Sequence, residues 1–366
     1  MMLFYLFCIV ILIQLGYILI GYSKVLFFKA PSSITPSTEG ISVIIAAKDE
    51  YSRLKVLIPT LLQQSYPNFE IIVILDRCQD DSEKYLKGIN DQRLHIIKQD
   101  IVEKGCSPKK SALTKGIQAA RHERLLFTDA DCLPMSKDWI QQMVQPYQVG
   151  MKNEIVLGVS LYQTGSGLLQ KFIQFETLHT ATQYLSMALW GIPFMGVGRN
   201  LSYRKSTFLK HGGFGNQMNI LSGDDDLMIN KMAHSSNTSI CIHQAGQTYS
   251  FPETTWRSWY RQKKRHLSVG KFYSLRNKIL LGFNSTSQIS VYFLYLILLA
   301  LDIQVVAASL LFWSRIGGLT LVLYQSARRL HSPLSWWLVP LMDLLHVIYQ
   351  LVIGMVATLS KQKTWN

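Results

Sequence analysis

Residues 124–131 read RLLFTDAD, an apolar run that ends in two acidic side chains. The run Arg124–Thr128 predicts a buried strand, and Asp129 and Asp131 follow it directly. Two carboxylates at this spacing can bind one divalent cation and leave coordination positions for water and phosphate oxygens. The sequence contains neither G-x-x-x-x-G-K-[ST] nor G-x-G-x-x-G, the loops that hold phosphates through backbone amides. We therefore expect Mg²⁺ or Mn²⁺ at Asp129 and Asp131, where it would neutralise bound phosphate groups.

The sequence before this strand alternates between strand and helix patterns. β-Branched runs at Ile41–Ile45 and Glu70–Leu75 flank a helical spacing of apolar residues over Leu54–Gln64. Strand, helix, strand is the unit of a parallel sheet, in which ligands bind beyond the carboxyl ends of the strands. We expect Lys48–Glu50 and Asp76–Asp80 at that edge. The other elements predicted before Arg124 are a strand over His95–Lys98 and a helix over Ser111–Ala120.

Composition separates membrane-like segments from an ordinary globular part. Of the 366 residues, 48% are hydrophobic, and the runs Met1–Ser23 and Ile279–Leu301 carry no charge. Each run is long enough to cross about 30 Å of hydrocarbon as a helix. A net charge of +14 suits an anionic partner, and the apolar runs favour lipid headgroups or a phosphorylated substrate over nucleic acid. The five cysteines form no C-x-x-C pair, so neither a structural zinc site nor a disulfide framework is indicated.

The flanking charges predict a multi-pass protein of the cell (inner) membrane. Residues 1–23 lack a cleavage site and are interpreted as a retained anchor, and the cations that follow in the linker 24–40 place the next domain in the cytoplasm. Two or three further spans are expected within 281–360. The last of them contains Asp343 and His346, for which hydrogen bonding between helices is favoured over a functional role.

The motifs, taken in order, resemble the family 2 glycosyltransferases of GT-A fold. The similarity extends from about Gly40 to Lys271, and it rests on the opening strand, on the D-R-C-x-D stretch at Asp76–Asp80, on the sequence KKSAL at 109–113 and on the D-x-D pair. It implies an α/β fold, a Rossmann-like cytoplasmic domain with a mixed sheet over 41–255 that binds a nucleotide sugar. The implied binding residues are Ala47, Lys48, Glu50, Asp76, Lys110, Asp129 and Asp131, with Asp76 accepting from the base and Lys110 near the diphosphate.

A second acidic stretch, LSGDDDLMINKM at 221–232, is similar to the G-D-D pattern of the chitin, hyaluronan and cellulose synthase-like branch. That similarity implies that Asp225 is the general base, flanked by Asp224. Adjacent carboxylates repel, so at least one should have a raised pKa suited to accepting a proton. The alternative is a helix cap with acids in the first turn of a helix over Leu227–Ala233, and both interpretations can hold together.

The segment 256–280 is basic and aromatic. Trp256–Lys278 contains eight Lys or Arg, no acid and five aromatic residues, which predicts a helix lying in an anionic membrane interface. Within it, QKKRH resembles the family's Q-x-x-R-W motif, which implies that Gln262 and Arg265 act near the donor diphosphate and the acceptor. His266 replaces the tryptophan, and this argues against processive polymer synthesis.

These observations give one leading hypothesis and two alternatives. The hypothesis is an inverting membrane-bound hexosyltransferase that moves a sugar from a nucleotide-diphosphate donor to the hydroxyl of a lipid-linked or glycan acceptor, in lipid-linked glycan or cell-surface polysaccharide synthesis. The first alternative is a processive polysaccharide synthase. The second is a non-catalytic membrane scaffold whose basic aromatic segment binds lipid; it gives no reason for carboxylates at two separate strand ends.

Overall fold

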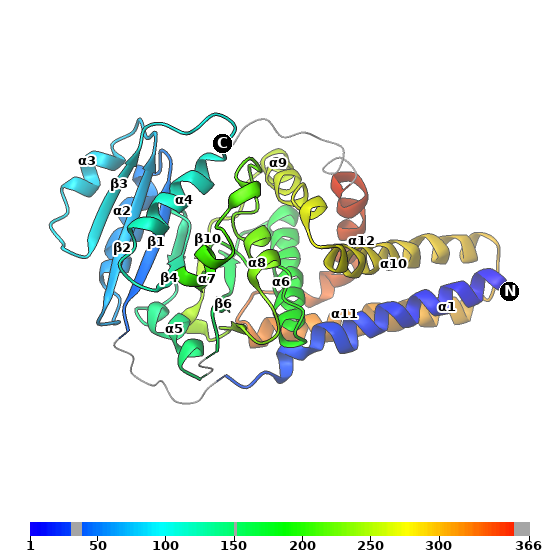
Figure 1. Ribbon diagram of the computed structural model, residues 1–366. Coiled ribbons are helices and arrows are strands. Elements are labelled where there is room, and N and C mark those ends of the chain that lie inside the picture. The colour runs from blue at the N-terminus through cyan, green and yellow to red at the C-terminus, as the bar shows by residue number, and fades with distance from the viewer. Residues whose placement is uncertain (31–38, 150–151, 355–366) are drawn as a thin grey trace. The chain divides into compact units, whose positions relative to one another are not determined.

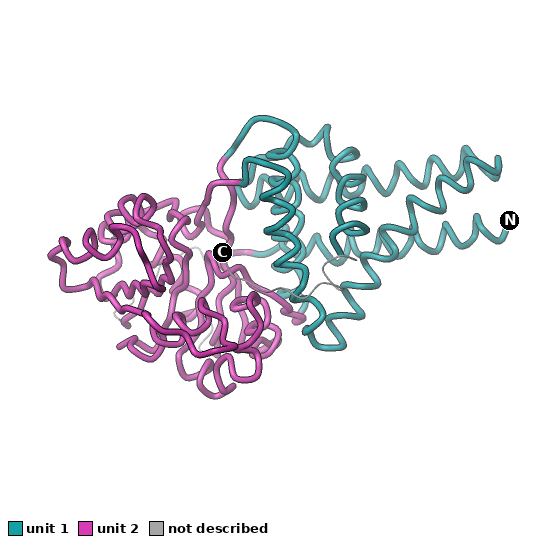
Figure 2. Tube along the Cα trace, turned by 90° about the horizontal axis from the view of Figure 1, so that it is seen from above, with its two compact units in different colours: residues 1–28, 164–190, 253–360 teal, residues 29–163, 191–252, 361–366 magenta. Residues whose placement is uncertain are grey.

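The computed structural model describes residues 1–30, 39–149 and 152–354. It divides into two compact units, which Figure 2 colours differently. Within the described ranges, residues 29–163 and 191–252 form one, called the sheet unit here. Residues 1–28, 164–190 and 253–354 form the other, called the helical unit. The segment Thr164–Trp190 therefore interrupts the domain expected over 41–255, while the other domain boundaries stay predictions.

The sheet unit is built on a seven-stranded mixed sheet of order β3-β2-β1-β4-β8-β6-β9 (Figure 1). Strands β3, β2, β1 and β4 are parallel, and β8 pairs with β4 in the antiparallel direction. The strands are β1 (Ile41–Ala47), β2 (Phe69–Asp76), β3 (Leu94–Gln99), β4 (Arg124–Phe127), β6 (Ile155–Leu157), β8 (Leu201–Arg204) and β9 (Thr238–Ile240). The mixed α/β sheet expected from the sequence is confirmed, and the parallel half is the part that the β-branched runs predict.

Helices cover the parallel strands, so β1 and β2 are buried along almost their whole length. The covering helices are α2 (Tyr51–Leu62), α3 (Ser82–Lys87), α4 (Pro108–Ala119) and α5 (Trp139–Val149). Helix α4 packs closely on the sheet, since a Cβ added at Gly116 would lie 2.6 Å from Ile74 Cδ1. This packing brings the first turn of α4 to the carboxyl ends of the strands.

A second, three-stranded sheet has the order β5-β10-β7. Its strands are β5 (Cys132–Pro134), β10 (Thr248–Ser250) and β7 (Ser160–Tyr162). Strand β5 begins directly after Asp131, so this small sheet extends from the D-x-D pair. Four short helical elements also belong to the sheet unit: α7 (Lys205–Lys210), η3 (Gly215–Gln217), α8 (Asp226–Met232) and η4 (Gln244–Gly246).

The helical unit contains the apolar helices. Its elements are α1 (Met2–Leu15), continued by η1 (Gly16–Tyr22) and η2 (Ser23–Phe27), then α6 (Leu168–Leu189), α9 (Trp256–Leu267), η5 (Gly270–Phe272), α10 (Leu275–Ala300), α11 (Val305–Arg329), η6 (Trp336–Leu338), α12 (Val339–Tyr349) and η7 (Gln350–Gly354). Helices α1, α10 and α11 run alongside one another (Figure 1). Within the described residues, four helical stretches are long and apolar enough to cross a membrane: Met2–Phe27, Leu275–Ala300, Val305–Arg329 and Trp336–Gly354.

The prediction of one helix along Trp256–Lys278 is wrong in the extent of that helix. Helix α9 ends at Leu267, and Lys278 already belongs to α10. At the end of α9 the Ser268 hydroxyl donates to the Arg265 carbonyl at 2.7 Å, a side-chain bond that competes with continued helix. Gly270 then lowers helix propensity further. The basic and aromatic residues are therefore divided between α9, η5 and the start of α10.

Candidate functional site

The D-x-D pair emerges from β4 as expected. Asp129 Oδ1 accepts a hydrogen bond from Lys109 Nζ at 2.9 Å, and Asp131 Oδ1 accepts one from Cys132 Sγ at 3.3 Å. One potential ligand atom from each of Asp129, Asp131 and Cys132 lies within 4.8 Å of the others. The two carboxylates fit a hard cation such as Mg²⁺ or Mn²⁺, which prefers oxygen ligands to a thiol.

Lys109 is the residue that connects this pair to the second acidic stretch. Its Nζ lies 2.9 Å from Asp129 Oδ1 and 2.9 Å from Asp224 Oδ2. Burial alone would lower the pKa of Lys109, but these carboxylates raise it above its usual value. Lys109 holds together side chains from β4 and from the start of α8. The sequence predicts a place near the diphosphate for the neighbouring residue, Lys110. Its Nζ is buried and donates to the Gln217 carbonyl at 2.8 Å, and that role stays a prediction.

Asp225 caps helix α8. Its Oδ1 accepts from the Asp226 amide at 2.8 Å, and its Oδ2 accepts from the Gly198 amide at 2.7 Å. A Cβ added at Gly198 would lie 3.2 Å from Asp225 Oδ2, so glycine permits this close approach. The helix-cap interpretation is thereby confirmed, and the carboxylate is held in a fixed orientation.

The two neighbouring carboxyls have opposite pKa shifts. Burial, followed by the adjacent charge of Asp224, raises the pKa of Asp225. Burial also acts to raise the pKa of Asp224, but the Lys109 ammonium in direct contact outweighs it and lowers that pKa below its usual value. A carboxyl with a raised pKa beside one with a lowered pKa is the arrangement expected of a proton acceptor and its charged neighbour.

These groups share one small pocket. Asp129, Asp224 and Asp225 line it together with Lys109 and the hydroxyl-bearing Tyr203. The acidic side chains come from two stretches of sequence about ninety-five residues apart, one after β4 and one at the start of α8, and they meet in this pocket. The pocket therefore joins one candidate metal ligand, Asp129, to a candidate base, while Asp131 is not among the residues that line it.

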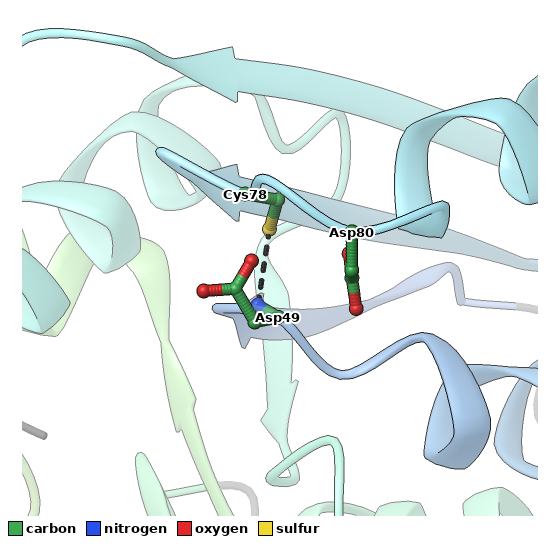
Figure 3. Close-up of side chains that lie close together, drawn as sticks. All are labelled: Asp49, Cys78 and Asp80. Carbon is green, nitrogen blue, oxygen red and sulfur yellow. Dashed lines mark hydrogen bonds between the residues drawn. The ribbon is translucent and has the colours of Figure 1, made fainter.

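The residues expected to bind the nucleoside lie on the loops after β1 and β2, which are tied together (Figure 3). Cys78 Sγ accepts from the Asp49 amide at 3.4 Å, and Asp80 Oδ2 accepts from the Tyr51 amide at 2.8 Å. Ala47 ends β1, and Lys48 and Glu50 follow it in this loop.

Two of these expected ligands already have internal partners. Glu50 pairs with Arg53 at 2.8 Å, and burial raises the pKa of Glu50. Asp76 is fully buried at the end of β2, where it pairs with Arg77 at 2.8 Å and accepts from Gln99 Nε2 at 2.9 Å. The nucleoside-binding roles stay predictions.

Gln262 and Arg265 belong to the helical unit, whereas Asp129 and Asp225 belong to the sheet unit. The roles of Gln262 and Arg265 near the donor diphosphate and the acceptor also stay predictions. Gln262 Nε2 donates to Glu253 Oε1 at 3.4 Å. Between the two residues, Lys263 is buried and pairs with Glu176 of α6 at 2.5 Å. This ion pair fixes the rotation of α9 against α6.

The fold resembles that of a solved structure. It is similar to the mannosyltransferase PcManGT from Pyrobaculum calidifontis, determined in complex with GDP-Man and Mn²⁺, with a TM-score of 0.62 at 14% identity over 90% of this chain and 99% of that one. The architecture is therefore that of the GT-A glycosyltransferases. Residues 42–212 match the family model described as Glycosyl transferase family 2. Over these residues, a little under half of the chain, the protein matches glycosyltransferase family 2.

Curated relatives agree with that assignment over part of their length. The chain is 26% identical over 181 residues to EpsH of Bacillus subtilis (strain 168), a protein named as a glycosyltransferase, covering 48% of this chain and 49% of that protein. It is 24% identical over 111 residues to 4,4'-diaponeurosporenoate glycosyltransferase of Staphylococcus aureus (strain USA300), covering 30% of this chain and 29% of that protein. The chain thus spans about half or less of the length of these relatives.

Proposed function

We propose that this protein is an inverting glycosyltransferase that moves a hexose from a nucleotide-diphosphate donor to an acceptor hydroxyl. One observation carries the proposal: carboxylates from two distant segments, Asp129 and the Asp224–Asp225 pair, line one pocket and are bridged by Lys109. A non-catalytic scaffold gives no reason for this convergence or for the opposite pKa shifts of Asp224 and Asp225.

The donor side of the reaction is assigned to the D-x-D pair. Asp129 and Asp131 would hold Mg²⁺ or Mn²⁺, which supplies positive charge against the donor diphosphate. Mn²⁺ accompanies GDP-Man in the mannosyltransferase of similar fold. Arg265 of α9 is proposed to face the leaving diphosphate, with Gln262 beside it, because charge that develops there needs a fixed cation.

The acceptor side is assigned to Asp225. Its carboxylate takes the proton of the acceptor hydroxyl while that oxygen forms a bond to the anomeric carbon. The bond from that carbon to the diphosphate oxygen breaks, and the nucleoside diphosphate leaves with its electrons. A single displacement of this kind inverts the anomeric configuration. The raised pKa of Asp225 makes it a better proton acceptor than an ordinary surface aspartate.

We further propose a location in the cell membrane with the sheet unit in the cytoplasm. Four apolar helical stretches are long enough to span a membrane, and Lys24 and Lys29 lie at the end of the first one or just after it. An acceptor that is itself membrane-bound, such as a lipid-linked glycan, fits this setting. Single transfer is preferred over processive synthesis, since His266 replaces the tryptophan of the family motif.

The test uses the full-length protein purified in detergent and a panel of nucleotide sugars. We expect metal-dependent turnover of one donor in the wild type and a loss of roughly 10²- to 10⁴-fold in Asp225→Asn, with nucleoside-diphosphate affinity retained. Asp100→Asn, a change at an exposed carboxyl, serves as the control and keeps full activity. Loss of nucleoside-diphosphate binding in step with activity in Asp225→Asn would argue against the base assignment. No turnover of any donor by the wild type contradicts the proposed reaction.

A further inference from the structure

Arg199 is a cation near the pocket that no motif above assigns. It follows Gly198, whose amide binds Asp225, and its guanidinium lies 4.4 Å from the centre of the Tyr162 ring. Arg199 Nη1 donates to Ser250 Oγ at 3.2 Å. The side chain is thus stacked on an aromatic face and oriented by one hydrogen bond.

The small sheet places this arginine beside the D-x-D pair. Ser250 of β10 pairs in register with Cys132 of β5 and with Tyr162 of β7, so the three residues form one row across the sheet. Asp131 is the residue directly before Cys132 in the sequence. A guanidinium that touches Ser250 and Tyr162 therefore lies at the edge from which the candidate metal ligands emerge.

The backbone beneath Arg199 is firmly held. The Arg199 carbonyl accepts from Thr248 Oγ1 at 3.1 Å. The next residue, Asn200, is fully buried, and its Nδ2 donates to the Val159 and Gly246 carbonyls at 2.8 Å each. Arg199 is consequently positioned before any ligand arrives, which lowers the entropic cost of binding.

The charge of Arg199 is not neutralised by direct contact. Among the described residues, no carboxylate lies within ion-pair distance of its guanidinium, although the charges of Asp131 and Asp129 act on it from further away. The side chain is partly exposed. A guanidinium has five N–H donors, and its one hydrogen bond to a described residue is the bond to Ser250. The remaining donors match the oxygens of a phosphate or carboxylate.

We infer that Arg199 is an oxyanion-binding residue of the transfer site, a role that rests on the proposed function. The ligand chemistry is that of a phosphate group. Two sources can supply it: the diphosphate of the donor, or an anionic group on a lipid-linked acceptor. Lysine at this position would keep the charge but lose the planar pairing and the stacking on Tyr162.

The experiment measures binding by full-length wild-type protein, Arg199→Gln and Arg199→Lys, with divalent metal chelated. The first arm titrates UDP and GDP, and the second titrates inorganic phosphate in the presence of a saturating nucleoside diphosphate. If Arg199→Gln binds UDP or GDP roughly tenfold more weakly, the group that Arg199 binds is the donor diphosphate. If it binds inorganic phosphate roughly tenfold more weakly in the second arm, that group is an anionic group of the acceptor. We expect the affinity of Arg199→Lys to lie between those of the wild type and Arg199→Gln. Arg121→Gln, at the amino-terminal edge of the main sheet, is the matched control and binds as the wild type does.

Unchanged affinity in both arms, in a variant with the wild-type thermal unfolding midpoint, overturns the inference. If Arg199→Gln unfolds early, Arg199→Lys takes its place, because it keeps the charge and an aliphatic stem, and unchanged affinity in that variant overturns the inference as well. These binding measurements do not need sugar transfer. A wild type that binds these anions through Arg199 but transfers no sugar would contradict the proposed function and leave the anion-binding assignment standing.

Discussion

Asp224 and Asp225 are neighbours in sequence, yet they face different electrostatic surroundings. Asp224 contacts the Lys109 ammonium at 2.9 Å, while Asp225 accepts two backbone amides and makes no ion pair with a described residue. The same acidic run therefore supplies one carboxylate that stays ionised and one that is suited to exchanging a proton. A run of three acids on an exposed helix would not separate in this way, because water would screen each charge alike.

The pH dependence of transfer follows from this pair. Asp225 must be ionised to accept a proton, so activity is present above its pKa and is lost as the pH falls through it. Burial and the Asp224 charge raise that pKa. In Asp224→Asn the repelling charge is gone and Lys109 still faces Asp225, so its pKa falls. We expect the acidic limb of the kcat/KM profile to move to lower pH. A limb that stays in place or moves upward would show that another group controls it.

Lys109 and Arg199 are residues of the candidate site that the sequence alone does not identify. Lys109 and Lys110 are adjacent, and composition does not choose between them. Helical spacing does not choose either, since Leu113 lies four residues after Lys109 and three after Lys110, and Lys110 is the one that is fully buried. Arg199 offers no signal either, because its neighbours Tyr162 and Ser250 come from strands of three residues.

At the scale of elements, the parallel half of the sheet could be predicted and the rest could not. β1, β2 and β4 are apolar runs with clear turn signals, and the D-x-D pair follows directly from them. Strands β5, β7 and β10 are too short to show a period of two. Polar and apolar residues are mixed around the circumference of helix α6, so its sequence has no apolar face that indicates its neighbours. It groups with the helical unit rather than the sheet.

Helix α4 carries Lys109 to the pocket, and Gly116 sets how closely it approaches the sheet. In Gly116→Ala the added Cβ would lie 2.6 Å from Ile74 Cδ1 and 3.0 Å from Ile44 Cγ2. We expect the variant to lose about 1–3 kcal/mol of stability, because extra volume in a packed core forces neighbours to move. Denaturant unfolding in detergent measures this. The control is Gly282→Ala in α10, whose Cβ meets nothing within 4 Å. Equal or higher stability of Gly116→Ala would mean that α4 does not pack as described.

At the scale of the whole molecule, buried polar side chains link the apolar helices of the helical unit. Arg315 of α11 pairs with Asp343 of α12, and its Nη2 donates to Gln14 Oε1 of α1 at 3.0 Å. From α10, Gln288 Nε2 donates to Asp343 Oδ1 at 2.7 Å and Ser287 Oγ accepts from Gln14 at 2.8 Å. Hydrogen bonding between helices, the favoured interpretation for Asp343, is confirmed, and it joins all four candidate spans.

This network predicts a non-additive response to mutation. Asp343→Leu alone leaves the Arg315 charge buried without its partner, which typically costs about 3–5 kcal/mol. In the double variant Arg315→Met with Asp343→Leu no charge remains buried, and an apolar pair fits the surrounding helices. We expect the single variant to lower the thermal unfolding midpoint in detergent strongly and the double variant to recover most of the loss. The control is Arg328→Met, at an exposed position near the end of α11, with little effect. Losses that simply add would show that each charge acts on its own, as in a catalytic or ion-conducting role, and that the pair does not hold the helices together.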